Sequence, residues 1–317
     1  MPKLKSKFLI NVEYFTFYFF YTLIRLMPLK LAYILSNFFC RMIFLCDPKH
    51  RKRIIQHSIH AKIVDNIRDA KKFALQNFLH FSRVLVEVFK IEQLIKKGNV
   101  ADYVELKATP KAYKAFFGKN RTNAIIVTAH YGNWELSGMG YYFLTKFPVT
   151  AIMRPFNNPK IGKIFIKKRE AAGHELHQKT GAIKVLLKTL KKGNSIGIIA
   201  DQHAGSMEGV EVQFFNHPAR AHISPALMHL KTQIPILVGV TRRKPGYKFQ
   251  YEYVVSDPIM FSPTDNKEQD IKDLTQLYTS ELEKLIAEDP TQWLWAHRRW
   301  LDINRDRKKR KKRKTKK

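Results

Sequence analysis

The hydrophobic pattern of the first 46 residues differs from that of the rest of the chain. Residues 8–46 are almost continuously apolar, with a break at Pro28. The first part of this stretch runs about 17 residues before Arg25, near the lower length limit for spanning a bilayer, and the many Phe and Tyr residues favour a membrane interface. No small-residue cleavage motif follows, so we predict an uncleaved anchor over residues 1–46 that either spans the membrane or lies in its interface. A pair of buried core helices remains the alternative.

The pattern over the rest of the chain predicts an α/β domain over residues 47–304. Helical periodicity extends over residues 57–97, and from residue 124 short apolar runs alternate with amphipathic stretches. This alternation predicts a mixed sheet flanked by helices. The expected strands are 124–129, 149–153, 195–200, 234–240 and 249–255. The expected helices between and after them are 134–145, 159–173, 180–192, 223–232 and 266–288.

Composition adds a strong positive charge to this picture. The net charge is +31, and the segment 305–317 holds eleven Lys or Arg residues and one Asp. We expect that tail to be disordered because it lacks apolar residues. The charge predicts an anionic partner, either nucleic acid, an acidic protein or a phosphate-bearing lipid surface. The two cysteines, Cys40 and Cys46, indicate neither a disulfide framework nor a zinc site.

Polar residues follow four of the expected strands. Because ligands of α/β sheets bind beyond the carboxyl ends of the strands, these residues are the candidates for a functional site. The four segments are HYGNWE at 130–135, RPFNNP at 154–159, DQHAG at 201–205 and TRRK at 241–244.

The first of these segments predicts an acid–base pair. His130 ends a strand and Glu135 begins the next helix, with Gly132 allowing a tight turn and Asn133 suited to cap the helix. In that geometry the carboxylate of Glu135 would orient the imidazole of His130, which would act as general base. No Gly-x-Ser-x-Gly motif supplies a nucleophile, so the attacking hydroxyl would come from a substrate.

The other segments suggest substrate contacts. Arg154 offers a planar donor fork for phosphate or carboxylate. Asp201 has three open roles: pairing with Arg154, binding a metal or capping a turn, of which a metal is disfavoured because no further carboxylates lie nearby in the sequence. Farther on, WLWAHRRW at 293–300 is rich in Trp, which predicts core packing, while Arg298 and Arg299 are candidates to face an anionic ligand.

Several of these blocks together resemble the lipid A late acyltransferases, the lauroyl and myristoyl transferases of lipopolysaccharide synthesis. The blocks are TAHYGNWE, MRPFNNP, IIADQHAG, FFNHPARAHISPALMHLKTQIPILVGV and PTQWLWAHRRW, and they occur in the family's order. The His-x-x-x-x-Glu block alone is shared with many acyltransferases, including glycerol-phosphate ones. The segments 174–179 and His203 depart from the family pattern.

The resemblance implies a fold like that of the glycerol-phosphate acyltransferases, anchored at the cytoplasmic face of the inner membrane by an N-terminal helix. It implies transfer of a fatty acyl chain from acyl carrier protein to a hydroxyl of a Kdo-bearing lipid A precursor, with no cofactor or metal. His130 and Glu135 would be catalytic. The residues expected to contact substrate are Arg154, Asp201, Asn133, Asn157 and Gln202.

Three other functions remain open from the sequence. An acyltransferase of the same fold could act on another membrane lipid, such as a glycerophospholipid, an ornithine-type aminolipid or a mannosylated lipid. A thioesterase would use His130 to activate water. A basic nucleic-acid-binding protein would need exposed aromatic residues interleaved with basic ones, whereas the aromatic residues here concentrate in the apolar runs.

Overall fold

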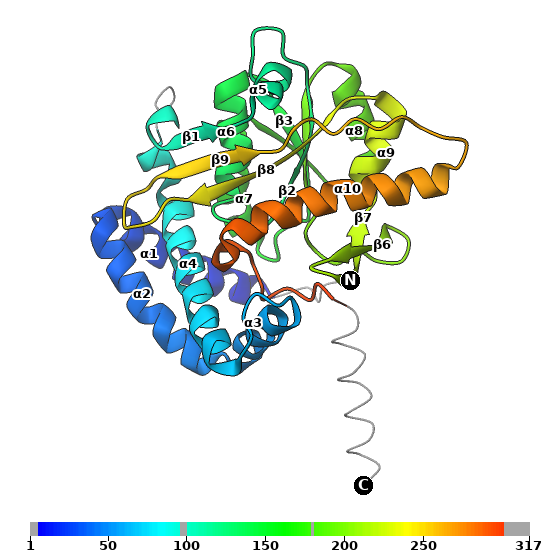
Figure 1. Cartoon of the computed structure of the whole chain (residues 1–317). Coiled ribbons are helices and arrows are strands. Elements are labelled where there is room, and N and C mark those ends of the chain that lie inside the picture. Colours follow the sequence, from blue (N-terminus) through cyan, green and yellow to red (C-terminus); the bar gives the residue numbers. More distant parts are fainter. Residues whose placement is uncertain (1–5, 96–99, 179–180, 301–317) are drawn as a thin grey trace.

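The computed structural model describes residues 6–95, 100–178 and 181–300. The expected basic tail, 305–317, lies outside these residues. So does Lys179, the last residue of the segment 174–179 that departs from the family pattern. Figure 1 shows a helical layer formed by the N-terminal part of the chain, beside a central sheet with helices on both faces. The mixed sheet flanked by helices that the sequence predicts is therefore confirmed.

Four helices make the N-terminal layer: α1 (Lys7–Leu26), α2 (Leu29–Cys46), α3 (Pro48–His60) and α4 (Ile67–Leu94). The first two pack against α4, where they bury Tyr21 and Tyr33. Of the described helices, only α2 is long and apolar enough to cross a membrane. The expected continuous helix over 57–97 is wrong, because the chain breaks after His60 and restarts where the Asn66 side chain accepts a hydrogen bond from the backbone N–H of Asp69.

The main sheet has seven strands in the order β1-β9-β8-β2-β5-β3-β4. Every neighbouring pair is parallel except β8 with β9. The strands are β1 (Val104–Lys107), β2 (Ile125–Thr128), β3 (Val149–Met153), β4 (His174–Gln178), β5 (Ser195–Ile199), β8 (Ile236–Arg243) and β9 (Tyr251–Val255).

Side chains of the central strands alternate between two hydrophobic cores. Ile125 and Val127 of β2 enter one core, while Ile126 enters the other. The first core packs under α8 (Ala182–Lys191), α9 (Ser224–Thr232) and α10 (Lys267–Glu288). The second core packs under α5 (Pro110–Phe116) and α6 (Glu135–Thr145), and it includes Ala172, which directly follows α7 (Pro159–Ala171).

The strands and helices that the sequence pattern missed are short or lie at edges. β1 and β4 are the edge strands, and β4 has the polar sequence HELHQ, which exposes most of its side chains. A separate hairpin joins β6 (Gly209–Phe214) to β7 (His217–His222). Its two turn residues, Phe215 and Asn216, both have positive φ, as a type I′ turn requires.

Candidate active site

The parallel register of β2 and β5 brings His130 and Asp201 together. Thr128 pairs with Ile199 at the strand ends, and two residues beyond each lie His130 and Asp201. The Nδ1 atom of His130 is 2.9 Å from Oδ1 of Asp201, and the backbone N–H of His130 donates to Oδ2 at 2.9 Å. The indole Nε1 of Trp293 donates to the same Oδ2 at 2.9 Å. Three donors thus fix a carboxylate that is 1% exposed.

The electrostatics of the pair favour a histidine that accepts a proton. Burial alone would raise the pKa of Asp201, but the attraction of His130 and the three hydrogen bonds lower it to about 2. Burial alone would lower the pKa of His130, but the Asp201 carboxylate outweighs that effect and raises it above its ordinary value. A charged Asp201 therefore holds the proton on Nδ1 and leaves Nε2 as the basic atom.

The expected contact between His130 and Glu135 is replaced by two separate pairs. The carboxylate of Glu135 binds Arg169 through two hydrogen bonds, 2.9 Å to Nε and 2.5 Å to Nη2. Burial would raise the pKa of Glu135, but Arg169 lowers it, so the carboxylate stays charged. Glu135 still helps to raise the pKa of His130 through its charge. The carboxylate that orients the imidazole is therefore that of Asp201. Of the roles open to Asp201 from the sequence, pairing with Arg154 is replaced by pairing with His130.

The loop between His130 and Glu135 depends on Gly132 for its conformation. Its φ of +54° and its contact with β8 leave no room for a side chain, since a Cβ atom would lie 1.7 Å from the carbonyl oxygen of Thr241. The backbone N–H of Gly132 donates to Gln292 O at 3.0 Å. The expected cap at Asn133 is wrong, because α6 begins at Glu135 with Trp134 in the N-cap position and no side-chain cap.

Asn133 is fully buried and its amide donates to Glu87 of α4 at 3.2 Å, so it supports the loop from behind and does not line the pocket. Arg154 lines the pocket and is exposed, whereas Asn157 is exposed but is not among the lining residues. Of TRRK, Arg242 pairs with Glu252 outside the pocket, and Arg243 is buried.

Gln202 and His297 complete the surroundings of the imidazole. The Nε2 atom of Gln202 lies 3.4 Å from both ring nitrogens of His130 and 3.0 Å from Nε2 of His297. The rings of His130 and His297 are 5.3 Å apart. Arg299, expected to face an anionic ligand, is buried and donates instead to backbone carbonyls of Gln202 and Arg220.

Three further residues belong to the site although the sequence pattern does not mark them: Trp293, His297 and Arg169. The Trp-rich segment 293–300 predicts core packing, and Trp295 and Trp300 are indeed fully buried. Nothing in the local pattern of α7 marks Arg169, because its partner Glu135 lies on another helix.

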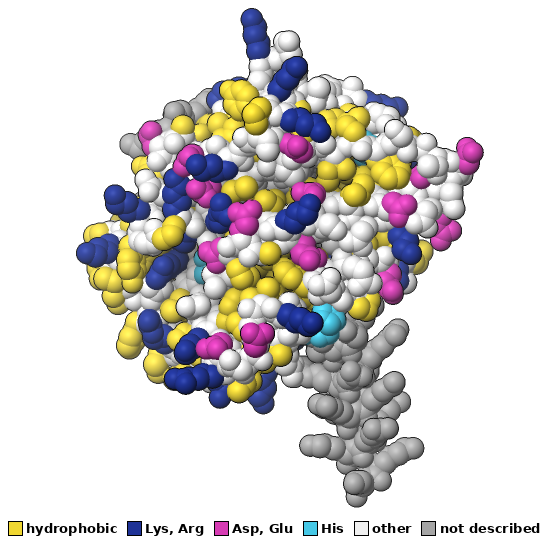
Figure 2. All heavy atoms as spheres, viewed as in Figure 1, with side chains coloured by type: hydrophobic (Ala, Val, Ile, Leu, Met, Phe, Trp, Pro, Cys, Tyr) yellow, Lys and Arg dark blue, Asp and Glu magenta, His cyan; other side chains and the backbone are white. Residues whose placement is uncertain are grey.

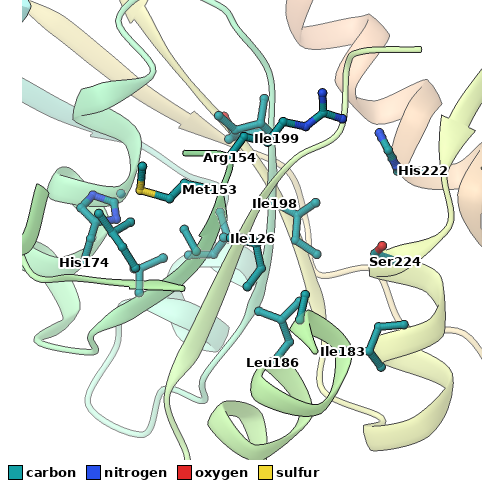
Figure 3. Close-up of a pocket in the computed structure, with 18 of the residues that line it drawn as sticks. Ile126, Met153, Arg154, His174, Ile183, Leu186, Ile198, Ile199, His222 and Ser224 are labelled. Atoms are coloured by element: carbon teal, nitrogen blue, oxygen red, sulfur yellow. The ribbon is translucent and has the colours of Figure 1, made fainter. Parts of the chain in front are cut away.

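A cavity of about 1080 Å³ opens at this edge of the sheet and reaches His130, Glu135 and Arg169. Strand β3 pairs with β5 only as far as Ala151 and Gly197, so their last residues separate. Apolar side chains from both strands and from α8 line the opening, as Figure 3 shows for Met153, Ile198 and Leu186. The space suits a long apolar substrate whose reactive end lies beside the imidazole.

The described residues contain no group of three His, Cys, Asp or Glu side chains that could hold a metal ion. An imidazole held by a buried carboxylate at the end of a large, mainly apolar cavity can accept a proton from a hydroxyl group of a bound lipid.

Comparison with known proteins places the chain more narrowly. The chain belongs to the bacterial lipid A biosynthesis acyltransferase family, whose sequence profile matches residues 1–302. It is 24% identical over 191 residues to a phosphatidylinositol mannoside acyltransferase of Mycobacterium tuberculosis, covering 58% of this chain and 57% of that protein. It is 23% identical over 187 residues to a lipid A biosynthesis acyltransferase of Haemophilus influenzae, covering 59% and 55%.

These alignments span little more than half the length of the curated relatives. Among solved structures, the 1-acyl-sn-glycerophosphate acyltransferase PlsC of Thermotoga maritima aligns over 81% of this chain and 98% of its own, with 12% identity and a TM-score of 0.33.

Proposed function

We propose that this protein transfers a fatty acyl chain, of the lauroyl or myristoyl class, from acyl carrier protein to a hydroxyl of the Kdo-bearing lipid A precursor. The observation that carries the proposal is the His130–Asp201 pair at the end of an apolar cavity. Family membership supports the acyl-transfer chemistry. The basic character of the chain suits both an acidic carrier and a phosphorylated lipid.

In this mechanism Nε2 of His130 removes the proton from the acceptor hydroxyl as its oxygen attacks the thioester carbonyl. The new C–O bond forms, the C–S bond breaks, and the imidazolium returns the proton to the departing thiolate. Asp201 stabilises the imidazolium between these steps. Because the Gly132 N–H is already bonded to Gln292, the pocket-lining guanidinium of Arg154 is the better donor for the transient oxyanion.

We propose that Glu135 acts through Arg169. The bidentate pair keeps the guanidinium in one orientation in the wall of the cavity, close enough for the carboxylate to influence the His130 pKa. Gln202 is proposed to hold the imidazole ring against rotation.

A second acceptor class deserves comparison because one relative is named a phosphatidylinositol mannoside acyltransferase. In that case the same base would deprotonate a hydroxyl of a mannosylated lipid.

The test uses purified protein, acyl carrier protein loaded with a lauroyl or myristoyl chain, and either the Kdo-bearing precursor or a mannosylated phosphoinositide. We expect mass spectrometry to show one added acyl chain on the Kdo-bearing precursor. His130→Ala should abolish transfer without unfolding the protein, because this residue follows a strand end and carries little of the core. Full transfer by His130→Ala, or release of free fatty acid in place of an acylated lipid, would contradict the proposal.

We propose that residues 1–46 anchor the protein at the cytoplasmic face of the inner membrane by lying in the interface. Both helices pack along α4, yet large apolar side chains on their outer faces are exposed. Figure 2 shows hydrophobic side chains interspersed with Lys and Arg at the edge formed by this layer. The most exposed of them include Phe8, Phe15, Phe19, Leu26, Phe38, Phe39 and Leu45.

Replacing Phe15, Phe19 and Phe38 with Ser should greatly weaken binding to vesicles that contain anionic lipid, since each aromatic ring contributes apolar burial on insertion. Vesicle flotation measures the bound fraction. A matched variant replaces Tyr113, Met260 and Leu277 with Ser; these side chains are also exposed but lie outside α1 and α2. Equal losses in both variants would show that binding does not depend on the α1–α2 face.

A further inference from the structure

Helix α8 presents a row of lysines on its outer face. Leu186 and Leu190 are buried against the sheet, while Lys184, Lys188 and Lys191 are exposed at spacings of four and three residues, which places them on one side of the helix. Within the described residues, none of the three forms an ion pair. The row is therefore available to an external partner.

The two helices that form this surface, α8 and α9, carry no acidic residue. The sequence contains no Asp or Glu between Glu175 and Asp201, nor between Glu211 and Glu252. These two stretches include all of α8 and α9, which pack against each other. Positive charge here is thus not neutralised by neighbours on the same elements, unlike that of Arg242 or Arg169.

The same helices border the cavity that leads to the base. Ile183 and Lys184 of α8 and Lys231 of α9 line it, and the Ile183 side chain is 47% exposed. Figure 3 shows Ile183 and Leu186 on one side of the opening, across from His174. A basic surface with an exposed apolar residue therefore borders the cavity that contains His130.

We infer that this α8–α9 surface, formed by Ile183, Lys184, Lys188, Lys191 and Lys231, docks an acidic carrier protein that delivers the acyl thioester. This inference rests on the proposed function. Figure 1 shows α8 and α9 at the far side of the sheet from α1 and α2, so a membrane bound by those two helices would leave the α8–α9 surface facing a soluble partner. Charge complementarity would orient the carrier so that its acyl arm enters the cavity.

The inference predicts a defect confined to the carrier-dependent step. The variant Lys188→Glu/Lys191→Glu, which leaves the cavity-lining Lys184 unchanged, should raise the KM for acyl carrier protein at least about tenfold, equivalent to about 1.4 kcal/mol of lost interaction. The kcat at saturating carrier should stay near that of the unaltered protein, because neither residue lines the cavity that contains His130. The salt dependence of kcat/KM should become weaker.

A matched control carries the same change of charge elsewhere. Lys111→Glu/Lys114→Glu alters two exposed lysines on α5, on the other face of the sheet. Acyl-pantetheine, a small thioester without the carrier, serves as a second donor that both variants should use normally. Normal use of acyl-pantetheine by the α8 variant also shows that it is folded.

The outcomes separate the inference from the proposed function. If the unaltered protein transfers no acyl chain to any lipid from any thioester, the proposed function fails. If it uses the carrier and the α8 variant is unimpaired, or the α5 control is impaired equally, the docking surface is wrong and the proposed function stands. A strong preference for acyl-coenzyme A over acyl carrier protein would overturn both the docking surface and the proposed acyl donor, while acyl transfer to the lipid would stand.

Discussion

Asp201→Asn is expected to lower kcat by about 10⁴-fold, the size of effect seen when the orienting carboxylate of a serine-protease triad becomes an amide. Asp201 keeps the proton on Nδ1 of His130 and stabilises the imidazolium through a 2.9 Å contact. Asparagine could donate its own N–H to Nδ1, which would place the remaining proton on Nε2 and remove the basic atom from the substrate side. Initial rates of acyl transfer with both substrates saturating measure this loss.

The same substitution has a signature in the pH profile. The Asp201 carboxylate raises the pKa of His130 against the opposing effect of burial. With the carboxylate gone, burial dominates and the pKa falls, so the acid limb of kcat/KM should move to lower pH. Glu135→Gln is the comparison, because Glu135 also raises that pKa but binds Arg169 directly. Near-normal turnover in Asp201→Asn, with a severe loss in Glu135→Gln, would reverse the roles assigned to the two carboxylates.

His130 and Asp201 show how much of the site can be predicted from a single sequence. The position of His130 at a strand end follows from the apolar run before it and the polar residues after it. The adjacency of Asp201 follows only from the register of β2 with β5, which a single sequence does not reveal because 71 residues separate the two side chains. Local sequence spacing pairs His130 with Glu135, five residues away. The parallel pairing of β2 with β5 instead places Asp201 beside His130.

The same distinction holds for the fold. The sequence pattern predicts β2, β3 and β5 to within a residue at each end, because strands covered on both faces of a parallel sheet form short, mainly apolar runs. The edge strand β4 carries two His, a Glu and a Gln among its five residues, so it has no comparable signal. The break between α3 and α4 was missed because the intervening segment, 61–66, retains Ala, Ile and Val at spacings that suit a helix.

A buried ionic cluster links the N-terminal layer to the loop that carries His130. Glu87 of α4 is 0% exposed and forms an ion pair with Arg243 of β8. Its carboxylate also accepts hydrogen bonds from the hydroxyls of Tyr33 on α2 and Tyr251 on β9, and from the amide of Asn133 at 3.2 Å. Five separate segments thus meet at one carboxylate.

Glu87→Gln should lower the free energy of unfolding by roughly 3–5 kcal/mol, because it leaves the buried guanidinium of Arg243 without a counter-charge. That loss is large beside the roughly 5–15 kcal/mol that stabilises a typical domain. Equilibrium unfolding in urea measures this loss.

The double variant Glu87→Gln/Arg243→Met should recover much of the stability, since it removes both charges. The matched control is Glu105→Gln, whose ion pair with Lys244 is exposed and should contribute little. An unfolding midpoint shifted no more by Glu87→Gln than by Glu105→Gln would show that the cluster does not hold the two layers together. The position of the His130 loop would then depend on the contacts of Gly132 with β8 and Gln292.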